Sequence, residues 1–100
     1  CNSVANNLQQ GYFPLVLSGD HSSALGVISG IKKAYPDKKL AIIWIDAHAD
    51  LHSPYTTPSG NMHGMTLATA IAEDNTENKV HEIDEKTKSL WEQLKSLMKN

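Results

Sequence analysis

The chain has 100 residues, of which 40% are hydrophobic and 20% are charged, which is the usual composition of a globular protein. A formal net charge of -2 leaves no basic surface on which a nucleic acid would bind. No apolar run approaches the roughly 18 residues that a membrane span requires, and the single cysteine, Cys1, has no partner for an internal disulfide. We therefore expect a cytoplasmic protein of one domain, or part of one, with neither nucleic acid nor membrane as its partner.

The first half of the chain predicts a strand, a helix and a second strand. Residues 13–17 form a short apolar run, and residues 40–45 form a second one that is rich in β-branched side chains. Between them, residues 22–35 carry apolar side chains at spacings of three and four, which predicts an amphipathic helix. The pattern indicates an α/β fold with a parallel sheet, in which the carboxyl ends of both strands lie at one edge.

The remaining segments are predicted to be helices and loops. We expect short helices over residues 4–10, ending at Gly11, and over residues 65–72, and a long polar loop over residues 46–60. His81 lies in a charged segment and is expected to be a surface residue. Asp84 is expected to cap a final helix with its lysines in solvent and with an apolar stripe made of Leu90, Trp91, Leu94, Leu97 and Met98.

Side chains that can bind a metal follow the second predicted strand at alternate positions, as Asp46, His48 and Asp50. In an extended chain all three would point to one side, and His21, which follows the first predicted strand, would reach the same edge of the sheet. Carboxylates and imidazoles suit borderline-hard divalent ions such as Mn²⁺, Fe²⁺, Co²⁺ or Zn²⁺. These side chains are too few to saturate two ions, so they predict about half of a two-metal site.

Simpler interpretations exist for each histidine taken alone. An isolated Asp-x-His at a strand end is more often a turn with a hydrogen-bonded histidine than a metal site, but the alternating ligands together with His21 favour metal binding. His63 alone would more often be a helix-start or solvated residue than a catalytic one, and His52 fits either class.

Three segments, residues 18–22, 46–50 and 59–64, resemble in order and spacing the signatures of the arginase, agmatinase and formimidoylglutamase superfamily of ureohydrolases. The similarity runs from about Gly11 to Leu67, and it is closest to arginase because Thr56 and Thr57 precede the third segment. The resemblance implies a three-layer α/β/α fold with a mainly parallel sheet. Residues 1–100 would be a partial ureohydrolase domain, with a metal-binding βαβ unit at residues 12–64 followed by helical segments.

The resemblance also implies which residues bind metal and act in catalysis. A complete active site would hold two manganese ions. His21 and Asp50 would bind one ion, His48 would bind the other, and Asp46 would bridge both. Asp50 would thereby take part in catalysis together with His63, which matches a histidine that moves protons at the mouth of the active site in the family.

The substrate loop is implied in the same way. Thr57, Ser59 and Asn61 match the loop that holds the α-carboxylate of the amino-acid substrate in arginases. His52 stands where arginases place an asparagine, which leaves the substrate open. The implied reaction is manganese-dependent hydrolysis of a guanidinium group, of L-arginine to L-ornithine and urea in the first place. The alternatives are a sister ureohydrolase acting on agmatine or formimidoylglutamate, and a truncated metal-binding module without catalysis.

Two parts of the family's active site have no counterpart in this sequence. These are a late Asp-x-Asp pair, which completes both metal shells, and a later glutamate, which holds the guanidinium group. We therefore expect the chain to be a fragment or a partial gene product. The complete enzyme is expected to bind a small guanidino substrate and to form a homo-oligomer, either a trimer or a hexamer.

Overall fold

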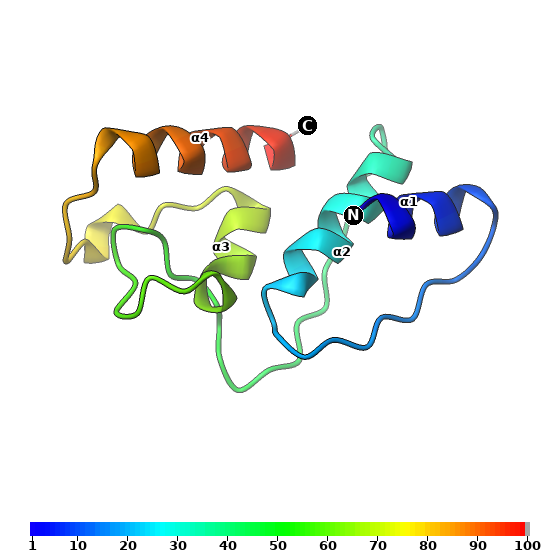
Figure 1. The fold of residues 1–100 in the computed structure, drawn as a ribbon, viewed down its shortest axis with the longest axis horizontal. Coiled ribbons are helices and arrows are strands. Elements are labelled where there is room, and N and C mark those ends of the chain that lie inside the picture. Colours follow the sequence, from blue (N-terminus) through cyan, green and yellow to red (C-terminus); the bar gives the residue numbers. More distant parts are fainter. Residues whose placement is uncertain (100) are drawn as a thin grey trace.

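The computed structural model describes residues 1–99, and its regular elements are helices (Figure 1). Two short 3-10 turns, η1 and η2, stand between the α-helices. Within the described residues, no helix combines the length and the apolar character needed to cross a membrane. The elements in chain order are α1 (Asn2–Gln9), α2 (Ser23–Ala34), η1 (Met62–Met65), α3 (Thr66–Ile71), η2 (Thr76–Asn78) and α4 (Glu85–Lys99).

The first two helices pack against each other at one end of the molecule (Figure 1). Val4 and Ala5 of α1 are buried, and α2 approaches them at Gly30. A Cβ atom on Gly30 would lie 2.6 Å from the carbonyl oxygen of Cys1 and 2.7 Å from the Cβ of Val4, so only glycine permits this approach. Helix α1 ends where predicted, before Gly11, whose φ of 84° belongs to the left-handed region.

The two predicted strands are not formed within the described residues. Residues 13–17 and 40–45 carry no strand assignment, and no backbone hydrogen bond joins one segment to the other in residues 1–99. A strand exists through its hydrogen-bond ladder to a neighbour, and a sheet of only two strands is marginal in water. The expected parallel sheet is therefore wrong as a description of this structure, whereas the helix that connects the two segments is confirmed as α2.

The two apolar segments nevertheless keep the alternating exposure of an extended chain. Val16, Ile42 and Trp44 line a cavity together with side chains of α2. Side chains at the alternate positions are outside this cavity and almost fully exposed, at 82–93% for Leu15, Ile43 and Ile45. Helix α2 thus covers one face of these segments, and the opposite apolar face is bare.

The second half of the chain has its own small core, where α3 and α4 lie side by side (Figure 1). Met65, Ala68 and Trp91 are buried there, and Leu51 and Tyr55 pack against them. Asp84 caps α4 as predicted, because its Oδ1 accepts the backbone N–H of Thr87 at 2.7 Å. Of the predicted apolar stripe on this helix, Trp91 is buried and Leu94 and Met98 are half-buried, while Leu90 and Leu97 are exposed.

One lysine of α4 departs from the prediction that all of them lie in solvent. Lys95 is 5% exposed, and its Nζ lies 2.6 Å from Asp74 Oδ1 and 2.7 Å from Glu92 Oε1. Asp74 also accepts the indole N–H of Trp91 at 2.7 Å. A buried ammonium group requires such acidic partners. Glu92 lies in the same helix, whereas Asp74 is far from Lys95 in sequence and reaches it across the core.

Candidate metal centre

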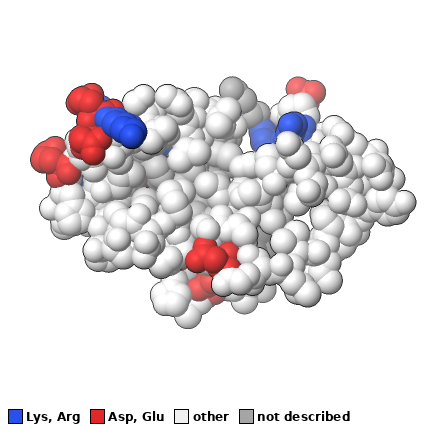
Figure 2. Space-filling model, viewed as in Figure 1, with Lys and Arg blue, Asp and Glu red and all other residues white. Residues whose placement is uncertain are grey.

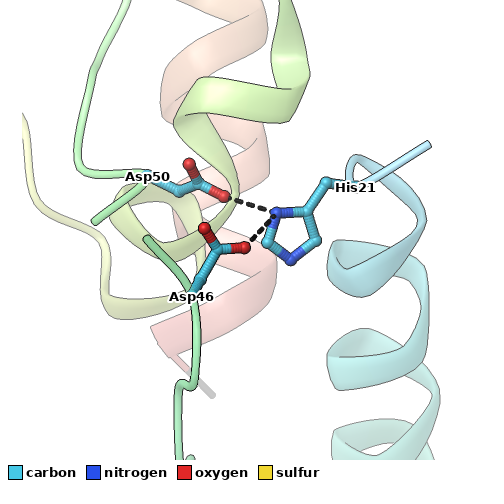
Figure 3. A group of neighbouring side chains, drawn as sticks. All are labelled: His21, Asp46 and Asp50. Atoms are coloured by element: carbon cyan, nitrogen blue, oxygen red, sulfur yellow. Dashed lines mark ion pairs between the residues drawn. The ribbon is translucent and has the colours of Figure 1, made fainter. Parts of the chain in front are cut away.

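Three of the predicted metal ligands converge between the start of α2 and the loop that precedes α3 (Figure 3). His21 Nδ1 lies 2.7 Å from Asp50 Oδ2 and 3.4 Å from Asp46 Oδ2. One ligand atom from each of the three residues lies within 4.8 Å of the others. The prediction that the ends of the two apolar segments meet at one place is therefore confirmed for His21 and Asp46, although the segments do not pair as strands.

Asp50 is held by the first turn of α3. Its carbonyl oxygen accepts the backbone N–H groups of Leu67 and Ala68, both at 3.1 Å. Helix-start N–H groups lack partners within their own helix, and this carbonyl satisfies two of them. The φ of Asp50 is 51°, a left-handed conformation that aspartate tolerates better than most residues. The two hydrogen bonds hold this conformation and turn the carboxylate of Asp50 toward His21.

One carboxylate oxygen of Asp50 is suited to a cation. Oδ2 is buried, and among the described residues no group donates a hydrogen bond to it. His21 Nδ1 lies within ion-pair distance of this oxygen, but its N–H direction does not make a hydrogen bond. An unpaired buried carboxylate oxygen is costly unless a cation or a donor reaches it. Two carboxylates and an imidazole are a donor set for borderline-hard divalent ions, so the residues fit the implied manganese.

Asp46 and His48 are linked to each other rather than projecting in parallel. The backbone N–H of His48 donates to Asp46 Oδ1 at 2.7 Å, and the His48 Nδ1 lies 3.1 Å from the same oxygen. This backbone hydrogen bond is the main reason why the pKa of Asp46 lies below its ordinary value. The turn directs His48 outward, so that its side chain is 83% exposed and outside the three-residue cluster. The expectation that residues 46, 48 and 50 point to one side is therefore wrong here.

Two residues that the sequence analysis did not assign to the site lie next to its ligands, and one of them, Trp44, contacts two of these ligands. The Trp44 ring stacks on the His21 ring, with centroids 4.7 Å apart, and its indole N–H donates to the His48 carbonyl at 3.2 Å. Asp20 accepts hydrogen bonds from the hydroxyl and the backbone N–H of Ser22, and these bonds lower its pKa. Trp44 was predicted only as part of a strand, and its position two residues before Asp46 was the one available signal.

The cluster opens into a cavity of about 780 Å³ that most of the other predicted site residues also line. These are His48, His52, Thr57, Ser59 and His63. Asn61 is not among the lining residues, although its backbone N–H donates to Ser59 Oγ at 3.2 Å. The ring of His52 is oriented by Thr56, whose Oγ1 lies 3.1 Å from His52 Nδ1.

Figure 2 shows one face of the molecule with its charged side chains coloured. A group of acidic side chains lies at the lower middle of that face, apart from the mixed charges near the start of α4. Such a local excess of carboxylates attracts cations.

Comparisons with known proteins show which family this chain resembles. The profile of the arginase family matches residues 1–89. The chain is 52% identical over 69 residues to an arginase of Bacillus caldovelox, and the match covers 69% of this chain and 22% of that protein. It is 47% identical over 70 residues to Arginase-1 of Rattus norvegicus, covering 70% of this chain and 21% of that protein.

Comparison of the structure with solved structures also finds an arginase. The structure resembles the crystal structure of an arginase from Bacillus cereus with a TM-score of 0.67 and 37% identity, covering 91% of this chain and 37% of that one. Sequence and fold together are those of a ureohydrolase segment. The chain belongs to the arginase family. It spans about a fifth of the length of the curated relatives named above, 22% and 21%.

Proposed function

We propose that this chain contributes the first part of a two-manganese centre to an enzyme that hydrolyses the guanidinium group of L-arginine to give L-ornithine and urea. The observation that carries the proposal is the buried carboxylate oxygen of Asp50, which has no hydrogen-bond donor and faces His21 and Asp46. His21 and Asp50 would bind one ion, Asp46 would bridge two, and His48 would bind the second. When bound, such ions activate water for attack at neutral pH.

His63 is proposed to move protons between solvent and the cavity. It is exposed, it lies in η1, and it lines the cavity that contains the metal cluster. An imidazole gains and loses a proton near neutral pH, so a histidine that contacts both solvent and the site can pass a proton to a leaving amine.

The loop hydroxyls are proposed to bind the substrate's α-carboxylate. Thr57 Oγ1 accepts the backbone N–H of Gly60 at 3.0 Å, and Ser59 Oγ accepts that of Asn61 at 3.2 Å. A hydroxyl that accepts a hydrogen bond still has its own proton to donate. Within residues 1–99 neither hydroxyl donates to another group. Both protons are therefore available to a carboxylate, with His52 and Asn61 beside them.

A chimera tests the proposal. Residues 1–89 of this chain replace the corresponding segment of the Bacillus caldovelox arginase, and urea release and manganese content are measured. We expect an active enzyme that loses most activity and the second metal equivalent in Asp46→Ala. The matched control Asp37→Ala, an exposed aspartate outside the cavity, should change neither. An inactive chimera with full manganese content would refute the catalytic proposal.

The same chimera tests the substrate. Agmatine lacks the α-carboxylate, so a site built around loop hydroxyls should lose roughly 1 to 3 kcal/mol with it, about 5- to 150-fold in kcat/KM. Equal values for arginine and agmatine, or a preference for agmatine, would favour a sister ureohydrolase.

A further inference from the structure

Residues 79–81, which lie outside the metal centre, contact the proposed substrate loop. The backbone N–H groups of Val80 and His81 both donate to the carbonyl oxygen of Tyr55, at 3.0 and 3.1 Å. The imidazole Nε2 of His81 lies 2.7 Å from the carbonyl oxygen of Thr57. Lys79 Nζ stands 5.6 Å from the centre of the Tyr55 ring. Residues 79–81 thus contact the loop at residues 55 and 57 with side chains as well as backbone.

The His81 contact has a defined direction. A carbonyl oxygen only accepts hydrogen bonds, so His81 Nε2 must carry the proton and donate it. Both the neutral Nε2–H tautomer and the imidazolium ion can do this, so the bond does not depend on the charge of the ring. Thr57 is separated from His81 by 24 positions in sequence, so the bond adds a side-chain link to the two backbone hydrogen bonds that join these loops at Tyr55.

The bond bears on the orientation of the Thr57 hydroxyl. Thr57 is 8% exposed and lines the cavity that contains His21, Asp46 and Asp50. Its backbone N–H donates to the Ser53 carbonyl at 3.0 Å, and the His81 bond fixes the carbonyl on its other side. With both peptide planes of Thr57 held, the side chain between them has a fixed direction toward the cavity.

We propose that His81 is a positioning residue for the loop of residues 53–60, and that through Thr57 it sets the binding of the substrate's carboxylate. The part that concerns substrate rests on the proposed function, whereas the ordering of the loop does not. His81 lines neither the metal cluster nor the cavity, so its imidazole acts through Thr57.

The experiment compares His81→Leu with His81→Gln in the isolated chain. The amide nitrogen of glutamine is as many bonds from the backbone as the imidazole Nε2 and can donate to the same carbonyl. Amide hydrogen exchange is read at Thr57 and at Gly60, whose N–H donates to Thr57 Oγ1, with Tyr35 in the α2 region as the reference. We expect His81→Leu to speed exchange of both loop amides about tenfold, as for loss of one hydrogen bond. Exchange at Tyr35 and manganese affinity should stay within about twofold.

His81→Gln should return the loop amides to within about twofold of the wild type. The ¹⁵N shifts of the His81 ring in the wild type should report a protonated Nε2. Loop amides that do not respond to His81→Leu, equal acceleration at Tyr35, no rescue by glutamine, or an unprotonated Nε2 would each overturn the positioning role. In the chimera, His81→Leu should raise KM for arginine several-fold and leave kcat within about twofold. If the chimera is inactive but the exchange results hold, the proposed function fails and the loop assignment stands.

Discussion

Replacing Asp74 by alanine should weaken the packing of α4 against the small core of Met65, Ala68 and Trp91. Asp74 Oδ1 accepts the indole N–H of Trp91 at 2.7 Å and lies 2.6 Å from Lys95 Nζ. The Lys95 side chain is only 6% exposed, so in Asp74→Ala its ammonium group would remain buried with Glu92 as its one described acidic partner. The Trp91 N–H would also lose its acceptor in the core.

The size of the effect follows from burial. A hydrogen bond to a charged group contributes about 1.5–3 kcal/mol, and two bonds that share one oxygen are not additive. Asp74 is 32% exposed on its side chain, so water stabilises part of its charge in either state. We expect a loss of about 2 kcal/mol, which for a chain of this size lowers Tm by roughly 8–16 °C.

Glu92 provides the matched control, because it pairs with the same Lys95 but is 53% exposed. Glu92→Ala should cost less than about 0.5 kcal/mol. Urea unfolding followed by far-ultraviolet circular dichroism measures both variants against the wild type. If Asp74→Ala unfolds at the same urea concentration as the wild type, or if both variants lose equal stability, the assignment of Lys95 and Asp74 to a buried ion pair is refuted.

Three further predictions concern other parts of the chain. Gly30→Ala should separate α1 from α2, because the added Cβ would lie 2.6 Å from the Cys1 carbonyl oxygen; we expect a loss of about 1–3 kcal/mol in urea unfolding, and unchanged stability would contradict the close approach. Burial raises the pKa of Asp74, but hydrogen bonds from Lys95 and Trp91 outweigh burial and leave the pKa below its ordinary value. The ionised Asp74 therefore adds to the free energy of unfolding above about pH 4, and this contribution is lost as the pH falls through the folded pKa. Between about pH 5 and 2 the wild type should lose more stability than Asp74→Ala. The bare apolar face should make the chain self-associate, and Leu15→Lys with Ile43→Lys, which are 82% and 89% exposed, should reduce the mass seen by light scattering without loss of helix content.

Local patterns in the sequence were sufficient to predict the helices. The spacing of apolar residues predicted α2, and Asp84 marked the start of α4, because a helix and its cap depend on neighbours within four positions. The strands could not be decided in this way, since a ladder depends on a partner elsewhere in the chain. Residues 40–45 have the composition of a buried strand and still form none.

The sequence predicted which residues meet at the candidate site better than it predicted how their side chains are oriented. Chain order indicated that His21 and Asp46 would meet, and they do. The outward turn of His48 arises from a backbone hydrogen bond to Asp46, which the alternation of residue types does not indicate. His81 was expected at the surface and is exposed, but its bond to the Thr57 carbonyl spans two loops, and no local pattern marks such a contact.

Manganese binding by the isolated chain tests directly whether His21, Asp46 and Asp50 form a metal centre. A titration followed by electron paramagnetic resonance compares the wild type with Asp50→Asn. This substitution keeps the size of the side chain and removes the negative charge of the carboxylate whose Oδ2 is buried without a hydrogen-bond donor. Asp37→Asn, an exposed aspartate outside the cavity, is the control. We expect weak binding by the wild type, an affinity lower by at least about tenfold in Asp50→Asn, and a change within about twofold in the control. Equal affinity in all three proteins, with helix content preserved, would contradict the assignment of His21, Asp46 and Asp50 to a metal centre.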